Sequence, residues 1–205
     1  KRSLEFLIKK YSLNEKNIKS VCFYEKPFKS WWEIFIYSIK KPLENKKLLT
    51  HHIKNFNTGS IFFYTHLNKI IKISKDKILY SSHHLSHCLY GSLYVKNVDD
   101  YAFISCDGVG EGETMTIYTI DSENLIKKHW TNFYPNSIGL FYSTITDFLG
   151  FDINEGEFKV MSLSSYGNPI YEKEMDQIFD CEKLKINSSY FEFQKNPERS
   201  FSEIL

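Results

Sequence analysis

Three consecutive β-rich runs in the middle of the chain constrain its fold more than any other feature. They cover residues 101–106 (YAFISC), 114–120 (TMTIYTI) and 125–134, and Gly- or Asp-containing turns separate them. Connections this short join antiparallel neighbours, because parallel strands need a crossover of a dozen or more residues. We therefore predict a three-stranded antiparallel meander. Just before it, a short strand at residues 78–80 runs into a helical pattern that begins at His83, which predicts a βα unit.

Apolar residues at helical spacing surround this meander, so the sequence predicts a mixed α/β domain. The expected helices cover residues 4–11, 30–41, 59–74, 83–94, 138–149, 158–163 and 170–179. Further strands are expected at residues 18–24 and 185–193. Ser30 stands three residues before Glu33, which is the spacing of a capping box, and Pro42 ends that helix. Residues 44–54 are basic and polar, and we predict no element there.

Length and charge exclude several classes of protein. A chain of 205 residues is long enough to bury a core, and 42% hydrophobic with 25% charged residues excludes a disordered or collagen-like chain. The 26 Lys and Arg residues nearly balance the 25 Asp and Glu residues, so no overall field recruits nucleic acid or an anionic membrane. No apolar run approaches the roughly 18 residues of a membrane span. We expect no membrane and no nucleic-acid partner.

Cysteine usage and the chain ends add two expectations. The cysteines lie far apart without a C-x-x-C spacing, which favours reduced thiols and a cytoplasmic protein. They are Cys22, Cys88, Cys106 and Cys181. The chain begins at Lys1 without a Met, and residues 203–205 look like the start of another element. We expect a piece of a longer protein.

A histidine pair carries the strongest chemical signal. His83 and His87 are four residues apart in a predicted helix, so they share one face with Cβ atoms about 5–6 Å apart. Asp107 directly follows the run 101–106, and an acid at the end of a buried strand lies where ligand sites of α/β sheets form. Two histidines and a carboxylate with open positions suit Fe²⁺, and also Mn²⁺ or Zn²⁺. The alternatives are a surface histidine pair and an acidic glycine-rich turn that only closes a hairpin.

The neighbours of the histidine pair are expected to pack. His84 points away from the shared face, so we expect it to neighbour the site and not to be a ligand. Cys88 lies about 100° from that face, so we expect a buried thiol rather than a ligand. Leu85 and Leu89 are expected to face the core. The other histidines, expected at the surface or in packing, are His51, His52, His66 and His129.

Two further segments could hold an anion. Gly108, Gly110 and Gly112 permit a left-handed backbone and a close approach of N–H groups to phosphate oxygens. Glu157 and Lys159 stand at the start of a short predicted helix, where the helix N-terminus and the lysine both favour phosphate. The alternative for the second segment is a solvated helix start in which Glu157 interacts favourably with the helix dipole.

Taken together, these strings resemble a known family. They are HHLSH at 83–87, DGVGE at 107–111, GEFKVM at 156–161, Tyr166-Gly167, YEKPF at 24–28 and FYPNSIGL at 133–140. The combination resembles the N-terminal domain of the O-carbamoyltransferases of the nodulation and antibiotic-biosynthesis type. The resemblance runs from about residue 10 to residue 193 and lies in the combination of strings, since no single string is specific.

The resemblance implies an actin-like/ribonuclease H-like ATPase fold, similar to the enzyme domain that threonylcarbamoylates tRNA adenosine. It implies that carbamoyl phosphate and ATP give carbamoyl-adenylate, whose carbamoyl group passes to a hydroxyl of a sugar or antibiotic. It also implies iron on His83, His87 and Asp107, where a metal would polarise the carbamoyl carbonyl and orient the adenylate. The residues expected near the nucleotide or carbamoyl group are Gly108, Gly110, Glu157 and Lys159.

The chain also departs from the family pattern. The opening β-hairpin is absent before Lys1, and a further carboxylate ligand and the carbamoyl-adenylate-forming domain would lie beyond Leu205. Residues 1–205 are thus expected to be part of the N-terminal domain and inactive alone. Ser164-Ser165 replace the usual Ala-Pro, and Cys88 replaces the usual Ala, without removing a proposed ligand.

Two rival functions stay open. A tRNA threonylcarbamoyl-transfer protein usually carries an acid inside the H-x-x-x-H motif, where this chain has Leu85-Ser86, and the near-neutral charge argues against an RNA partner. A non-catalytic nucleotide- or metal-binding module is the other rival. We expect small-molecule substrates, and a homodimer is allowed. The acceptor and the physiological metal do not follow from the sequence, because loops and missing segments shape the pocket.

Overall fold

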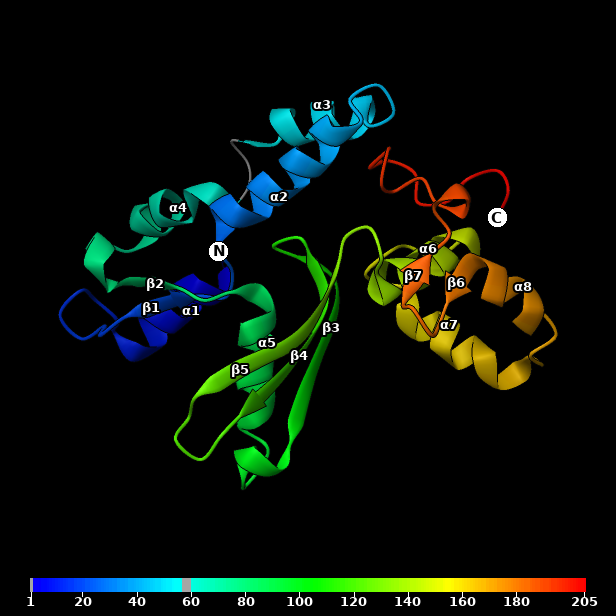
Figure 1. Cartoon of the computed structure of the whole chain (residues 1–205). Helices are drawn as coiled ribbons and strands as arrows, with labels where there is room; N and C mark the ends of the chain where they lie inside the picture. Colours follow the sequence, from blue (N-terminus) through cyan, green and yellow to red (C-terminus); the bar gives the residue numbers. More distant parts are fainter. Residues whose placement is uncertain (1, 57–59) are drawn as a thin grey trace.

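The computed structural model describes residues 2–56 and 60–205, and its elements form three groups along the chain (Figure 1). The first group holds α1 (Arg2–Tyr11), β1 (Val21–Phe23), α2 (Pro27–Lys40), α3 (Lys46–Lys54), α4 (Phe63–Ile70) and β2 (Ile78–Tyr80). The second holds α5 (His83–Ser92), β3 (Ala102–Gly110), β4 (Glu113–Ile120) and β5 (Ile126–Phe133). The third holds α6 (Ile138–Phe148), α7 (Glu157–Leu163), α8 (Glu172–Ile178), β6 (Phe179–Asp180) and β7 (Lys185–Ile186).

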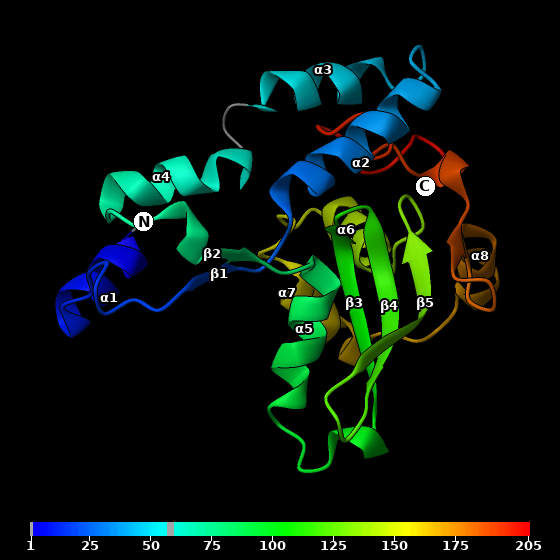
Figure 2. The same ribbon diagram turned by 60° about the vertical axis from the view of Figure 1, so that its left-hand side comes forward.

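The predicted meander is confirmed. Strands β3, β4 and β5 pair antiparallel in sequence order, and α5 lies alongside them (Figure 2). The expectation that the strand ends just before Asp107 is wrong, because β3 continues to Gly110 with a register shift after Cys106. The hairpin turn is instead the pair Glu111-Gly112, with φ values of +57° and +82°. Asp107 therefore sits within an irregular strand.

The predicted βα unit is also confirmed, and a second unit lies beside it. Strands β1 and β2 pair in parallel, with Val21 opposite Ile78 and Phe23 opposite Tyr80. β1 is shorter than the predicted strand and only half-buried. Parallel strands end at the same edge, so the helices that follow them, α2 and α5, begin next to each other. This edge faces the β3–β4 hairpin.

Several predicted boundaries in the first group are wrong. Helix α2 begins at Pro27, in the first helical turn where its missing N–H costs nothing, so Ser30 lies inside the helix and forms no capping box. Residues 44–54 contain α3, which packs on α2 and buries only Leu48, too weak a pattern to read from the sequence. Helix α4 is shorter than predicted and follows the 3₁₀ turn Ser60–Phe62; the predicted start at residue 59 lies outside the described residues.

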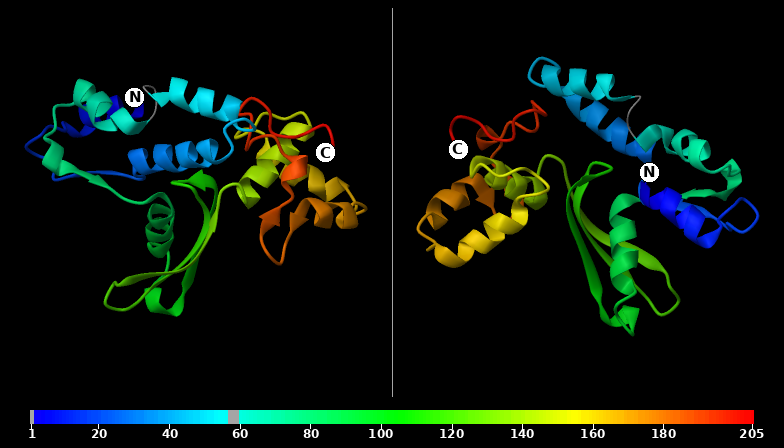
Figure 3. Two further views of the ribbon diagram at one scale, coloured as in Figure 1. Left: turned by 45° about the horizontal axis from the view of Figure 1, so that its top comes forward. Right: turned by 180° about the vertical axis from the view of Figure 1, so that it is seen from behind.

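The first group and the second group each pack around a buried cluster of their own. Leu67, Ile71 and Ile73 form a buried cluster on which α1, β1 and β2 pack. Between α5 and the meander, Cys88 packs against Tyr118 and Ile120 of β4. In both views of Figure 3, α1 and α4 lie on one side of the meander and α7 and α8 on the other, while α3 reaches the C-terminal segment, where the Leu48 N–H donates to the Lys195 carbonyl. The burial of apolar area in these cores is the main force that fixes α5 against the sheet.

The third group keeps its predicted helices but loses most of its predicted strand. Ser137 caps α6 by accepting a hydrogen bond from the Leu140 N–H, and Gly150 ends the helix region with φ +81°, both as predicted. The strand expected at residues 185–193 shrinks to Lys185–Ile186.

None of the described helices has the length and apolar character needed to cross a bilayer.

Candidate metal centre

Helix α5 and strand β3 bring three predicted ligands together. The Nε2 atom of His83 lies 2.6 Å from Oδ2 of Asp107, and Nε2 of His87 lies 3.4 Å from the same oxygen. The two Nε2 atoms are 3.2 Å apart. The one-turn spacing of the histidines on α5 sets the last distance, and the packing of α5 on β3 sets the other two.

These distances fit a common metal ion. Ligand atoms bonded at about 2.0–2.2 Å to one ion lie about 2.8–3.6 Å apart at angles between 90° and tetrahedral. The observed triangle of 2.6, 3.2 and 3.4 Å is close to that size. Two imidazoles and one carboxylate on a single triangular face leave the opposite face open, which is the arrangement of non-haem Fe²⁺ sites. The donor set therefore fits the predicted ion.

The centre is buried on one side and open on the other. The His83 side chain is 13% exposed, while Asp107 is 40% and His87 is 54% exposed. A substrate can therefore approach from the side of His87 and Asp107. The hydrogen bond from His83 holds the pKa of the Asp107 carboxyl well below its usual range, and the same bond raises the pKa of His83. The Asp107 carboxylate is thus ionised at neutral pH.

The residues beside the histidine pair largely follow expectation. His84 is buried: its Nε2–H donates to the Glu113 carbonyl and its Nδ1 accepts from the Thr116 hydroxyl, so it is a packed neighbour. Cys88 is a buried thiol, as predicted. Leu89 is 40% exposed, so the expectation that it faces the core is wrong.

Glycines make room for the ligands instead of adopting a left-handed backbone. Of Gly108, Gly110 and Gly112, only Gly112 has a positive φ. A Cβ on Gly110 would lie 2.2 Å from Cδ2 of His83, so a side chain there would displace the ring. Gly108 packs against Leu140, and its N–H donates to Oδ1 of Asp107. These glycines thus lie against His83 and Asp107, and their predicted approach to phosphate oxygens stays a prediction.

Helix α6 holds the backbone of Asp107, a feature that the sequence does not reveal. The Ser137 hydroxyl donates to the carbonyls of Asp107 and Gly108 at 3.0 and 2.7 Å. A Cβ on Gly139 would lie 2.7 Å from the carbonyl carbon of Asp107, so only glycine permits this approach. In the sequence, Ser137 and Gly139 form a Ser-x-Gly pattern after a turn, and this pattern is the one signal that points to the contact. By itself the pattern predicts only a helix cap.

Glu111 is the second residue that the sequence analysis missed. Its side chain is 1% exposed, and Oε1 accepts hydrogen bonds from the backbone N–H groups of Lys26 and His83 at 2.8 and 3.0 Å. These donors stand at the starts of α2 and α5, where unpaired N–H groups and the helix dipole attract a carboxylate. The Lys29 ammonium lies 3.3 Å from Oε2. Glu111 thus joins the hairpin to both helices.

Glu157 and Lys159 make their contacts within the third group. Oε1 of Glu157 accepts from the Ser143 hydroxyl and from the Asn154 N–H, which lowers its pKa. The Lys159 ammonium lies over the rings of Phe151 and Phe158. Glu157 therefore stabilises the start of α7, and its expected closeness to a nucleotide stays a prediction.

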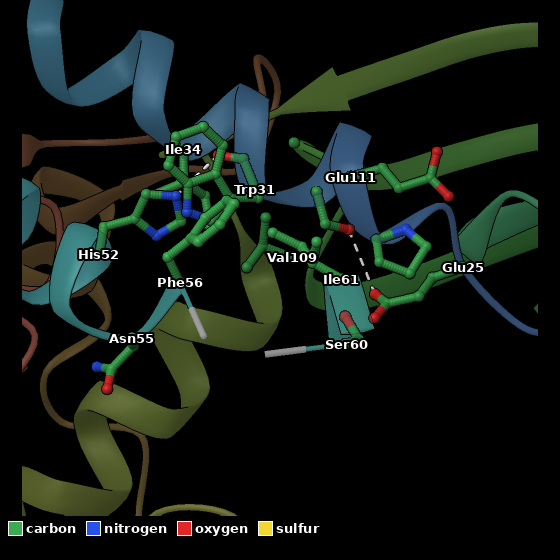
Figure 4. Close-up of a pocket in the computed structure, with 13 residues that line it drawn as sticks. Glu25, Trp31, Ile34, His52, Asn55, Phe56, Ser60, Ile61, Val109 and Glu111 are labelled. Carbon is green, nitrogen blue, oxygen red and sulfur yellow. Dashed lines mark hydrogen bonds between the residues drawn. The ribbon is translucent and has the colours of Figure 1, made fainter. Parts of the chain in front are cut away.

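A pocket of about 320 Å³ lies between α2, the residues after α3 and the β3–β4 hairpin. Figure 4 shows Trp31, His52 and Phe56 gathered at one end of it, with Glu25 toward the other. His52 stacks on Trp31 and donates from Nε2–H to the Trp31 carbonyl. Glu111 lines the same pocket, so the pocket adjoins the residue that contacts His83.

The fold and the site define an α/β domain with a candidate metal centre of two histidines and one carboxylate. The model of the carbamoyltransferase N-terminus family matches residues 1–204, so the chain belongs to that family. This match confirms the resemblance seen in the motifs.

The chain is also similar to two uncharacterized proteins. The first, from Synechocystis sp., is 25% identical over 203 residues, which cover 94% of this chain and 33% of that protein. The second, from Methanocaldococcus jannaschii, is 39% identical over 127 residues, which cover 58% of this chain and 24% of that protein. The chain therefore spans about a third or less of the length of these relatives.

Proposed function

We propose that this chain takes part in metal-assisted transfer of a carbamoyl group from carbamoyl-adenylate, made from carbamoyl phosphate and ATP, to a hydroxyl of a sugar or natural product. The family supports carbamoyl transfer in general. The participation of a metal ion is supported by the convergence of three ligand atoms from His83, His87 and Asp107. No other group of three such side chains meets in the described residues.

In this proposal His83, His87 and Asp107 hold Fe²⁺, with Mn²⁺ or Zn²⁺ as alternatives. A bound ion supplies Lewis acidity that polarises the carbamoyl carbonyl. The acceptor oxygen bonds to the carbamoyl carbon, the bond from that carbon to the AMP oxygen breaks, and AMP leaves with the electron pair. The hydroxyl proton passes to solvent, which reaches the exposed side of His87 and Asp107. Helix α5 contributes by orienting both imidazoles toward one point.

The acceptor is proposed to bind in the pocket beside Glu111. Its volume of about 320 Å³ is at the lower end of small-molecule sites, and its wall combines aromatic rings with a carboxylate. The Glu25 carboxylate accepts from the Ser30 hydroxyl and has further lone pairs for a ligand hydroxyl. Gly108, Gly110, Glu157 and Lys159 are proposed to lie near the nucleotide or carbamoyl group, as the family resemblance implies.

The larger context is also a proposal. We propose that residues 1–205 form part of an actin-like/ribonuclease H-like N-terminal domain. The chain covers 33% of the Synechocystis relative, which leaves room there for a second domain that makes carbamoyl-adenylate. The observed α/β composition, with a meander followed by α6, is compatible with this fold.

Anaerobic Fe²⁺ binding tests the proposal directly. Metal analysis after desalting should find about one equivalent of iron on the parent chain and none on a His87→Ala variant. His66→Ala is the matched control, because His66 is an exposed histidine on α4 and should leave binding unchanged. About one equivalent of iron on both the parent and the His87→Ala variant would remove His87 from the proposed ligand set.

A further inference from the structure

We infer that Glu111 is the positioning residue of the metal centre: its buried carboxylate fixes the start of α5 and thereby the place of His83. This inference rests on the proposed metal centre. In this role the β3–β4 hairpin turn not only connects two strands but also holds His83, which belongs to α5. Glu111 is not among the three converging ligand residues: Oε1 accepts from two backbone N–H groups, and Oε2 lies 3.3 Å from the Lys29 ammonium.

The first argument is the set of contacts that the carboxylate makes. Helix α5 begins after Ser82, whose side chain forms no cap, so the first N–H groups of α5 need another acceptor. Oε1 of Glu111 supplies it, at 3.0 Å from the His83 N–H. The same oxygen binds the Lys26 N–H at the start of α2. One atom therefore ties both helix starts to the hairpin.

The second argument is that the turn is locally unfavourable for glutamate. Glu111 and Gly112 form a two-residue hairpin loop in which both residues have positive φ. Such loops favour Asn, Asp or Gly, and a residue with a longer side chain is disfavoured in this left-handed conformation. Contacts elsewhere must offset that cost, and the helix starts and Lys29 are the contacts observed.

The third argument is that His83 lacks the usual support of a metal-binding histidine. Such a ring normally donates its second N–H to a carboxylate or carbonyl, which fixes its orientation. Nδ1 of His83 is buried without a hydrogen-bond partner among the described residues. The ring is instead confined by Gly110, whose missing side chain leaves the space that the ring fills. Glu111, the next residue, holds the backbone of the same histidine.

Three variants of the parent chain separate this role from simple folding. Glu111→Asn suits the turn better than glutamate but is one methylene shorter, so it should fold and lose the contact to α5. Its dissociation constant for Fe²⁺, measured anaerobically by competition with a coloured chelator, should rise about 10–100-fold. Glu111→Gln keeps the reach and one acceptor oxygen and should restore most of the affinity. Glu113→Gln, the control, loses its ion pairs with Lys128 and, at 3.8 Å, with Lys29, but its side chain touches no α5 N–H, so it should bind like the parent.

Hydrogen exchange of the His83 amide gives a second readout that needs no metal. The first N–H of a helix exchanges quickly unless it is capped, so Glu111→Asn should speed its exchange while Glu113→Gln leaves it unchanged. Unchanged exchange and unchanged Fe²⁺ affinity in Glu111→Asn would each overturn the inference. A parent that binds no Fe²⁺ would overturn the metal centre and the purpose assigned to Glu111, while the exchange data would still show whether Glu111 holds His83.

Discussion

The Nε2 atom of His83 and the Oδ2 atom of Asp107 lie 2.6 Å apart, although the two residues stand on a helix and a strand and are 24 positions apart in sequence. Their approach requires that α5 lie flat on β3, and the core at Cys88 and Tyr118 provides that packing. His87 then completes a triangle of ligand atoms without further movement of the chain. The fold therefore brings the three candidate ligand atoms within 4.8 Å of one another.

Asp107→Asn should weaken Fe²⁺ binding by about tenfold or more, because the neutral amide replaces the one anionic ligand while keeping the shape. Anaerobic titration with metal analysis measures this loss. Asp176→Asn is the control, since Asp176 is exposed on α8 and should leave the affinity unchanged. An Asp107→Asn variant that binds iron like the parent would remove Asp107 from the ligand set.

Gly110→Ala should destabilise the chain by about 1–3 kcal/mol, because its Cβ would overlap His83 and force the ring to move. Gly91→Ala is the matched control. Its Cβ would meet Phe103 at an ordinary 3.7 Å, and alanine is the better helix former within α5, so stability should rise by up to about 1 kcal/mol. Urea unfolding of both variants measures whether the free energy of unfolding falls or rises. Equal changes in the two variants would contradict the contact between Gly110 and His83.

Ser137→Ala should lower the free energy of unfolding by about 1–2 kcal/mol, because α6 loses its cap and two carbonyls lose a donor. It should also weaken Fe²⁺ binding, since the Asp107 backbone is no longer held. The control is Ser162→Ala, whose hydroxyl bonds only within exposed α7. Urea unfolding and the Fe²⁺ titration provide the two measurements. Unchanged stability in Ser137→Ala would contradict the capping role.

His52 should make the chain less stable in mild acid. Burial lowers the pKa of its imidazole below the ordinary 6.5, so the folded state prefers the neutral ring. The unfolded state then binds more protons, and the stability contributed by His52 is lost as the pH falls below 6.5 toward the folded pKa. Urea unfolding at pH 7.5 and 5.5 should show a larger loss in the parent than in His52→Gln. An equal loss in both proteins would contradict this prediction.

Much of the local structure follows from the sequence alone. Alternating and β-branched residues specify the meander, and the four-residue spacing of His83 and His87 places both on one helix face whatever surrounds them. Ser137 marks the start of α6 because its hydroxyl satisfies a helix N–H. These features depend on neighbours in the chain, so a short window of residues suffices to predict them.

Short elements could not be predicted, because a short window of residues does not contain the distant contacts that form them. Helix α3 buries a single leucine, and β6 has only two residues, so neither leaves a periodic pattern. The strand at Asp107 continues to Gly110 because pairing with β4 outweighs the turn preference of its glycines. In each case a contact with a distant segment decided the local conformation.

The assembly of the centre was decided by the tertiary structure. The sequence identified His83, His87 and Asp107 as candidate ligands, but it gave no sign that Glu111 would reach the start of α5 or that Gly110 would face the His83 ring. Periodicity describes which face of an element a side chain occupies and not which other element that face meets. The packing of the β3–β4 hairpin against two helix N-termini selects those partners, because a buried carboxylate is stable only where N–H donors and a cation surround it.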